Sequence, residues 1–129
     1  MIVRTLASIL NTAAHVKGDA FESRRILLSA DGLGYSLHDT LCKAGTEQHL
    51  EYKNHVETNY VIEGVGEVVN VATGQTWPLG PGTVHWTAPA SWMTRAMKEL
   101  YLCNARLREF RGQTNYTIPS GFLHELPRD

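Results

Sequence analysis

The chain has 129 residues, a formal net charge of −1 and 19% charged residues. This length favours one domain, residues 1–129, that can bury a core without a disulfide or metal staple, and the charge lacks the basic excess of a nucleic-acid binder. The two cysteines, Cys42 and Cys103, form no CxxC pair, which favours free thiols in a reducing compartment. No basic leader precedes a long apolar run, and no run reaches transmembrane length. We therefore expect a cytoplasmic protein with no membrane or nucleic-acid partner.

A short helix is predicted over residues 5–11, because Leu6, Ile9 and Leu10 share one face and Thr5 can cap it. Beyond residue 21 the chain consists of short apolar runs broken by Gly, Asn and Asp. These runs predict strands over residues 25–29, 34–42, 48–52, 57–63, 66–71, 76–79, 84–87, 92–96 and 100–103. Strands at this spacing are typical of an antiparallel sandwich or barrel, so the expected fold class is all-β.

One polar segment, residues 45–64, carries four candidate metal ligands in short succession: His49, Glu51, His55 and Glu57. Residues two apart on a strand face the same side, so His49 and Glu51 are expected to project together. A glutamate that faces a barrel interior loses its hydration unless it gains a partner, and a metal ion is such a partner. The alternative is that these residues face solvent on a polar strand surface, which is the favoured interpretation for any one histidine alone.

Two spacings favour the metal interpretation for the set. Glu57 and Gly64 fit the Glu-x6-Gly pattern of a cupin barrel, and Gly82-x-x-His85 fits its later imidazole motif. Nitrogen and oxygen ligands of this kind suit iron, manganese, nickel or zinc. We predict a divalent transition metal held by Glu57 and His85, with His49 or Glu51 completing the ligand set, although His49-Leu-Glu51 departs from the usual His-x-His.

A closer likeness lies in six blocks: residues 1–6, 22–28, 31–40, 44–47, 52–57 and 62–67. These blocks resemble ectoine synthase, a cupin enzyme of compatible-solute biosynthesis, and the resemblance is strong over about residues 1–82. It implies a cupin (double-stranded β-helix, jelly-roll) barrel behind a short N-terminal helix, a cytoplasmic homodimer and a catalytic metal. That metal is expected to be Fe(II), with zinc or manganese as alternatives. The family reaction closes N-γ-acetyl-diaminobutyrate to ectoine with loss of water, which is carbon–oxygen lyase (cyclase) chemistry.

The resemblance also implies roles for individual residues. Glu57 matches a family iron ligand, and Arg25, Thr40 and Tyr52 match residues that line the substrate pocket. Catalytic roles are expected for Tyr52, Glu57 and, if the alignment slips by two residues, Cys103. The residues expected to bind substrate are Phe21, Arg25, His38, Thr40, Trp86 and Trp92.

Several positions depart from the family pattern. Phe21 stands where a pocket tryptophan is usual, Glu51 stands where a histidine is usual, and His85 replaces a tyrosine ligand. Trp92 or Met93 falls at the next histidine ligand, and Arg111 and Gln113 follow where the family has Glu and His.

Three hypotheses remain at this stage. The first is ectoine-type ring closure, in which the metal acts as a Lewis acid, Arg25 binds the substrate carboxylate and Tyr52 moves a proton. The second is a diverged paralogue in specialised metabolism that acts on another small metabolite and turns the family substrate over poorly. The third is a non-catalytic cupin that only binds a small ligand.

Overall fold

The structure, a computed structural model, describes residues 1–51, 55–87 and 91–108, with the side chains of residues 55, 107 and 108 left out of the description. Helix α1 (Leu6–Ile9) opens the chain, and a single 3-10 turn, η1 (Ser29–Asp31), lies between two strands. The strands are β1 (His15–Lys17), β2 (Phe21–Leu27), β3 (Tyr35–Cys42), β4 (Glu47–Glu51), β5 (His55–Glu63), β6 (Gly66–Asn70), β7 (Thr76–Leu79), β8 (Val84–Thr87), β9 (Ser91–Ala96) and β10 (Leu100–Arg108).

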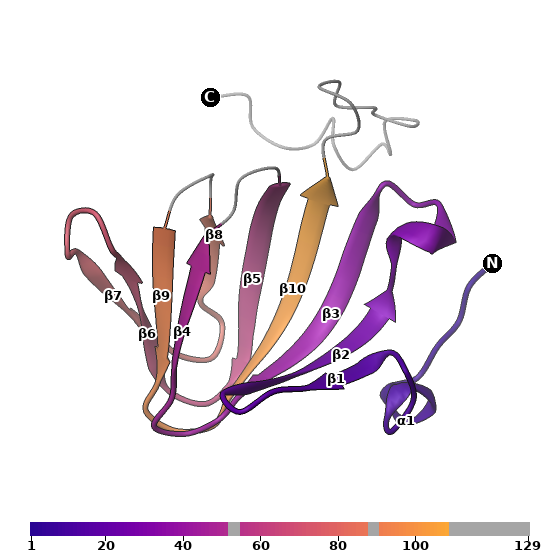
Figure 1. The fold of residues 1–129 in the computed structure, drawn as a ribbon, viewed down its shortest axis with the longest axis horizontal. Helices are drawn as coiled ribbons and strands as arrows, with labels where there is room; N and C mark the ends of the chain where they lie inside the picture. The colour runs from indigo at the N-terminus through magenta and orange to yellow at the C-terminus, as the bar shows by residue number, and fades with distance from the viewer. Residues whose placement is uncertain (52–54, 88–90, 109–129) are drawn as a thin grey trace.

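The strands form two sheets that face each other (Figure 1). The six-stranded sheet has the order β1-β2-β3-β10-β5-β8, and the four-stranded sheet has the order β4-β9-β6-β7. Every neighbouring pair is antiparallel. The all-β prediction is therefore confirmed. In the described part of the chain no helix has the length and apolar character needed to span a membrane.

The N-terminal helix is shorter than predicted, but its cap is the predicted one. The Thr5 hydroxyl accepts a hydrogen bond from the Ser8 amide at 3.2 Å, and the Ser8 hydroxyl accepts one from the Thr5 amide at 3.3 Å. This reciprocal pair satisfies two amide groups that the first turn would leave unbonded. Asn11, at a φ of 61°, lies in the left-handed region beyond the helix end.

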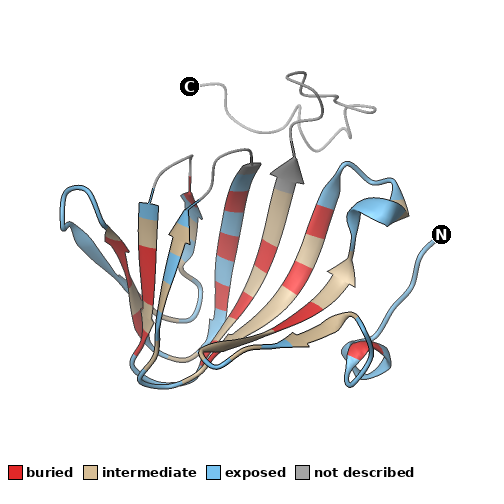
Figure 2. Cartoon of the chain, in the orientation of Figure 1, coloured by how far each residue is buried: buried red, intermediate tan, exposed pale blue. Residues whose placement is uncertain are grey.

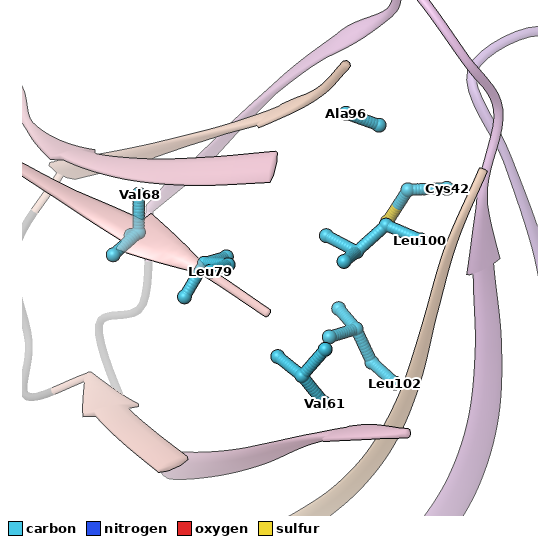
Figure 3. Packing of buried hydrophobic residues seen from close by; sticks show 7 residues of the cluster. All are labelled: Cys42, Val61, Val68, Leu79, Ala96, Leu100 and Leu102. Carbon is cyan, nitrogen blue, oxygen red and sulfur yellow. The ribbon is translucent and has the colours of Figure 1, made fainter. Parts of the chain in front are cut away.

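An apolar cluster closes one end of the space between the sheets (Figure 3). The six-stranded sheet contributes Cys42, Val61, Leu100 and Leu102, and the four-stranded sheet contributes Val68, Leu79 and Ala96. Val61 and Leu100 are fully buried. Burial alternates along β3, β5 and β10 (Figure 2), as expected for strands with one face inward.

Candidate functional site

A cavity of about 210 Å³ lies between the two sheets, above the apolar cluster. Its walls are Phe21, Ser23, Arg25, His38, Thr40, Cys42, Gln48, Leu50, Glu57, Asn59, His85, Thr87, Trp92, Thr94, Leu102, Asn104 and Arg106. The volume suits a small metabolite, since sites for drug-sized ligands are larger.

Strand register arranges the polar lining of the larger sheet in rows. Side chains directly opposite one another on neighbouring strands share a face, so each row of partners runs straight across the cavity wall. One row consists of Arg25, His38, Asn104, Asn59 and His85, in strand order β2-β3-β10-β5-β8. The next row toward the open end consists of Ser36, Arg106, Glu57 and Thr87. On the other side, the row of Ser23, Thr40, Leu102 and Val61 leads down to the apolar cluster.

Glu57 is the buried acid of this site, with 3% of its surface exposed. Its Oε2 forms an ion pair with Arg106, with Nε of the guanidinium 2.6 Å away. The angle at the Nε–H group does not meet the criterion for a hydrogen bond. Its Oε1 accepts a hydrogen bond from the Asn104 amide at 3.2 Å, and Oδ1 of Asn104 accepts one from the Thr40 hydroxyl at 3.0 Å. The carboxylate is thus held by two side chains of β10 and, through Asn104, by one of β3.

His85 faces Glu57 from the row alongside. Burial lowers the pKa of His85 below its usual value, against the opposing influence of the Glu57 charge. Its Nδ1 is buried and has no hydrogen-bond partner among the described residues. Near neutral pH the imidazole is therefore uncharged and can accept a proton.

The opposite end of the same row carries the cationic group of Arg25. Its Nε is buried and has no hydrogen-bond partner in the described part of the chain. A buried donor without a partner costs free energy, so this position is suited to an acceptor brought by a ligand. Beside it, the Ser23 hydroxyl lies 3.4 Å from Nδ1 of His38.

The four-stranded sheet contributes shape rather than charge. Its lining residues are Gln48 and Leu50 on β4 and Trp92 and Thr94 on β9, which are paired in register as Gln48 with Thr94 and Leu50 with Trp92. The Trp92 ring also stacks at an angle of 46° on Trp77, with the ring centroids 6.2 Å apart.

Seven of the residues predicted from the sequence lie together at this cavity: Phe21, Arg25, His38, Thr40, Glu57, His85 and Trp92. Two others, Cys103 and Trp86, do not line it because their side chains lie on the opposite face of their strands. Cys103 is on the far face of β10, between the cavity-lining Leu102 and Asn104, and Trp86 is 63% exposed on β8. Trp86 lines a second, more open and apolar hollow beside Trp77. Tyr52 lies outside the described residues.

His49 and Glu51 need a separate correction, because they were expected to complete a metal site. They do project together, but both are exposed on the outer face of β4. The inward positions of β4 are Gln48 and Leu50, one residue out of phase with the predicted ligands. The structure therefore does not bring His49 or Glu51 to Glu57 and His85.

Ten of the lining residues were not predicted as site residues, among them Asn59, Asn104 and Arg106. Asn59 could have been found, because it is two positions beyond Glu57 on the same predicted strand and therefore faces the same side. Asn104 and Arg106 lie beyond residue 103, where the predicted strand ended, whereas β10 continues to Arg108.

The residues at the cavity offer few ligands for the expected divalent metal. Among the described residues no group of three or more His, Cys, Asp or Glu side chains is placed to hold a metal ion. Glu57 and His85 share the cavity, but both carboxylate oxygens of Glu57 are already approached by donors of Asn104 and Arg106. A guanidinium charge at this distance opposes a second cation on the same carboxylate. The donor set of the described residues therefore does not fit an Fe(II), zinc or manganese ion.

Comparison with known proteins places this geometry in a family. The family model described as ectoine synthase matches residues 1–105. L-Ectoine synthase of Oceanobacillus iheyensis is 52% identical over 85 residues, and that of Halalkalibacterium halodurans is 48% identical over 85 residues. Each alignment covers 66% of this chain and 66% of the relative, so the match spans about two-thirds of those proteins.

Solved structures agree with the sequence comparison. The crystal structure of ectoine synthase from P. lautus matches with a TM-score of 0.81 and 39% identity, covering 87% of this chain and 81% of that chain. A Cupin_2 domain of an XRE family transcriptional regulator from Enterobacter cloacae matches with a TM-score of 0.60 and 13% identity, covering 71% of this chain and 100% of that one, and shows the shared fold alone. The chain has a cupin fold and belongs to the ectoine synthase family.

Proposed function

We propose that this protein catalyses ring closure of the ectoine synthase type, converting N-γ-acetyl-diaminobutyrate to ectoine with loss of water. The names of its relatives and of the P. lautus structure support this function over a diverged paralogue or a non-catalytic cupin. The observation that carries the proposal is one row of side chains across a closed-ended cavity, with the cation Arg25 at one end and an uncharged His85 beside Glu57 at the other.

Arg25 anchors the substrate carboxylate. Its planar fork matches a carboxylate, and its buried Nε has no partner among the described residues until a ligand supplies one. Anchoring the carboxylate at one end directs the rest of the substrate along the row toward His85. A chain held folded between these two points has its α-amine near its own amide carbonyl, which makes the condensation effectively unimolecular.

His85 moves the protons of the reaction. The amine nitrogen bonds to the amide carbon, and the carbonyl oxygen leaves as water after it has gained two protons. The substrate ammonium carries three protons, of which two leave in that water and the third remains on the amidinium product. A neutral imidazole can take each of the two protons from nitrogen and return it to oxygen.

Glu57 and the two asparagines of the row complete the site. The negative charge of Glu57 stabilises the positive charge that develops on the amidinium, and burial strengthens that attraction. The side-chain amides of Asn59 and Asn104 line the cavity and can donate to the carbonyl oxygen as it becomes anionic. Each of these groups is fixed by strand register before the substrate arrives.

A turnover assay with matched variants tests the function. We expect purified protein to form ectoine from N-γ-acetyl-diaminobutyrate, as measured by mass spectrometry. Arg25→Met should raise KM about 10- to 100-fold, because a charge-assisted hydrogen bond to the carboxylate is lost. Arg95→Met is the matched control, since Arg95 pairs with Glu47 and Glu67 away from the cavity. Absence of ectoine, or an Arg25 variant with the KM of the control, would contradict the proposal.

We also infer that the protein is a cytoplasmic homodimer. The outer faces of β5 and β8 expose Tyr60, Ile62, Val84 and Trp86, and Tyr60 stands directly opposite Val84 in the register. An exposed apolar surface of this kind favours association, and the two unpaired cysteines accord with a reducing compartment. Light scattering at micromolar concentration should give twice the chain mass, and Trp86→Glu should lower it. A monomeric wild-type protein would contradict the dimer.

A further inference from the structure

We propose that Arg106 supplies a permanent cation at Glu57, in the place where the family resemblance puts a metal, so that the site works without a divalent metal ion. The proposal concerns what balances the buried carboxylate. It holds whichever small molecule the cavity converts.

The first argument is the fixed geometry of the pair. Arg106 on β10 and Glu57 on β5 are directly opposite in the register, and their charged groups meet at 2.6 Å. Asn104, also on β10, donates to the other carboxylate oxygen and is itself oriented by Thr40. One carboxylate oxygen therefore accepts a hydrogen bond and the other lies beside a guanidinium charge, and both groups belong to a central strand of the larger sheet.

The second argument is electrostatic. Only 4% of the Glu57 side chain is exposed, so this charge needs a partner on the protein. Arginine keeps its charge at every pH at which a protein is folded, and 29% of the Arg106 side chain remains exposed. A divalent cation at Glu57 would have to overcome repulsion from that guanidinium or displace it from the carboxylate.

The third argument is the shortage of other ligands. Transition-metal sites in proteins use three or four side-chain ligands. The cavity wall also contains His85, His38 and Cys42, but no three His, Cys, Asp or Glu side chains among the described residues are placed to share a metal ion. His49 and Glu51 face outward on β4. A cation that is covalently part of the chain removes the need for a third and fourth ligand.

Metal content and metal response test the proposal without any substrate. Protein purified in the absence of chelator should contain less than about a tenth of an equivalent of iron, zinc or manganese by elemental analysis. Its Tm should be the same, within about 1 °C, in EDTA, in Zn²⁺ and in anaerobic Fe²⁺, because a metal that binds the folded state raises Tm. Near-stoichiometric metal that disappears in Glu57→Gln would overturn the proposal.

A double-mutant cycle tests the role of Arg106 itself. Arg106→Met should lower Tm by about 6–12 °C, because it leaves a buried carboxylate unbalanced. The double variant Glu57→Gln with Arg106→Met should recover at least half of that loss, since it removes both charges together. Arg95→Met, the control for loss of an exposed ion pair, should lower Tm by no more than about 3 °C.

The two experiments give distinguishable failures. Additive effects of the Glu57 and Arg106 substitutions would show that the two side chains are not coupled, and would overturn the assignment of Arg106. Failure to form ectoine would instead contradict the proposed reaction and leave the Glu57–Arg106 pair as measured by the cycle. If Arg106→Met fails to fold, the double variant decides the question. A soluble, folded double variant supports the coupling of Glu57 and Arg106, and a double variant that also fails to fold counts against it.

Discussion

Replacing Gly64 by alanine should destabilise the protein and disturb the apolar cluster next to the cavity, because no side chain fits at this position. Gly64 has a φ of 101°, in a region that residues with a Cβ avoid. A Cβ built there would lie 1.9 Å from the carbonyl oxygen of Glu99 and 2.8 Å from Cα of Leu100. Both neighbours are backbone atoms, so a rotamer change cannot relieve the clash. The chain before β10 would have to move away from the end of β5.

The size of the effect follows from comparison with Gly74. Gly74 has a φ of 72°, but a Cβ there would meet nothing within 4 Å, so Gly74→Ala costs only backbone strain of about 1 kcal/mol. Gly64→Ala adds displacement of Leu100, a fully buried residue of the apolar cluster, for which overpacking costs about 1–3 kcal/mol more. We therefore expect a total loss of about 2–4 kcal/mol, a large part of the 5–15 kcal/mol that stabilises an ordinary domain.

Urea unfolding followed by tryptophan fluorescence measures both variants against the wild type. Gly64→Ala should lower the midpoint urea concentration about two to four times as much as Gly74→Ala, with similar m-values. Because β5 carries Glu57 and β10 carries Arg106, the Gly64 variant should also bind substrate more weakly than the Gly74 variant. Equal midpoints for the two variants would refute the close contact with Glu99 as the reason for this glycine.

Two further predictions concern the cysteines and Asp31. Burial raises the pKa of Cys42 to about 11 and also raises the pKa of the less buried Cys103. Iodoacetamide at pH 8 should therefore label Cys103 first and Cys42 only after unfolding. Equal labelling of the two cysteines in mass spectra of the folded protein would contradict this. Arg4, which donates two hydrogen bonds of 2.7 Å to the Asp31 carboxylate, lowers the pKa of that group from 3.8 to about 2. The stabilisation is therefore complete above pH 3.8 and lost as the pH falls through about 2, so wild type and Asp31→Asn should differ in Tm at pH 6 and converge near pH 2. A Tm difference that stays constant across this range would exclude the ion pair as its cause.

Local sequence pattern located nine of the ten strands, β2 to β10, although β1 was missed and the bounds of β2 and β10 differ from those predicted. Glu57 and Gly64 were recognised by spacing alone, and the structure supplies a physical reason for the glycine in its contact with Glu99. The positions of Arg25, His38 and Thr40 followed from a resemblance that extends over many residues. His38 and Thr40 are two residues apart on β3, so a prediction that places one of them inward also places the other inward.

Parity on β4 could not be obtained in the same way. Leu50 is the only apolar residue of β4. Whichever face of β4 points inward, polar side chains line the cavity, and in the structure that polar residue is Gln48. Pairing with β9 decides the phase, since Leu50 lies opposite Trp92. Strand length caused the other omission. The predicted strand ended at residue 103, although the alternation of polar and apolar residues continues through Asn104, Ala105, Arg106 and Leu107, and β10 pairs with β3 and β5 over this stretch.

The two walls of the cavity differ in the kind of side chain that they contribute, and this difference affects which substitutions the protein can accept during evolution. Among the described residues, every charged side chain that lines the cavity comes from the six-stranded sheet. The four-stranded sheet contributes only uncharged groups, among them Leu50, Trp92 and Thr94. Substitutions there alter the outline of the cavity and leave the proton-handling groups in place. Substitutions on the four-stranded sheet can therefore change the size of the metabolite that fits, while the reactive groups on the six-stranded sheet are conserved.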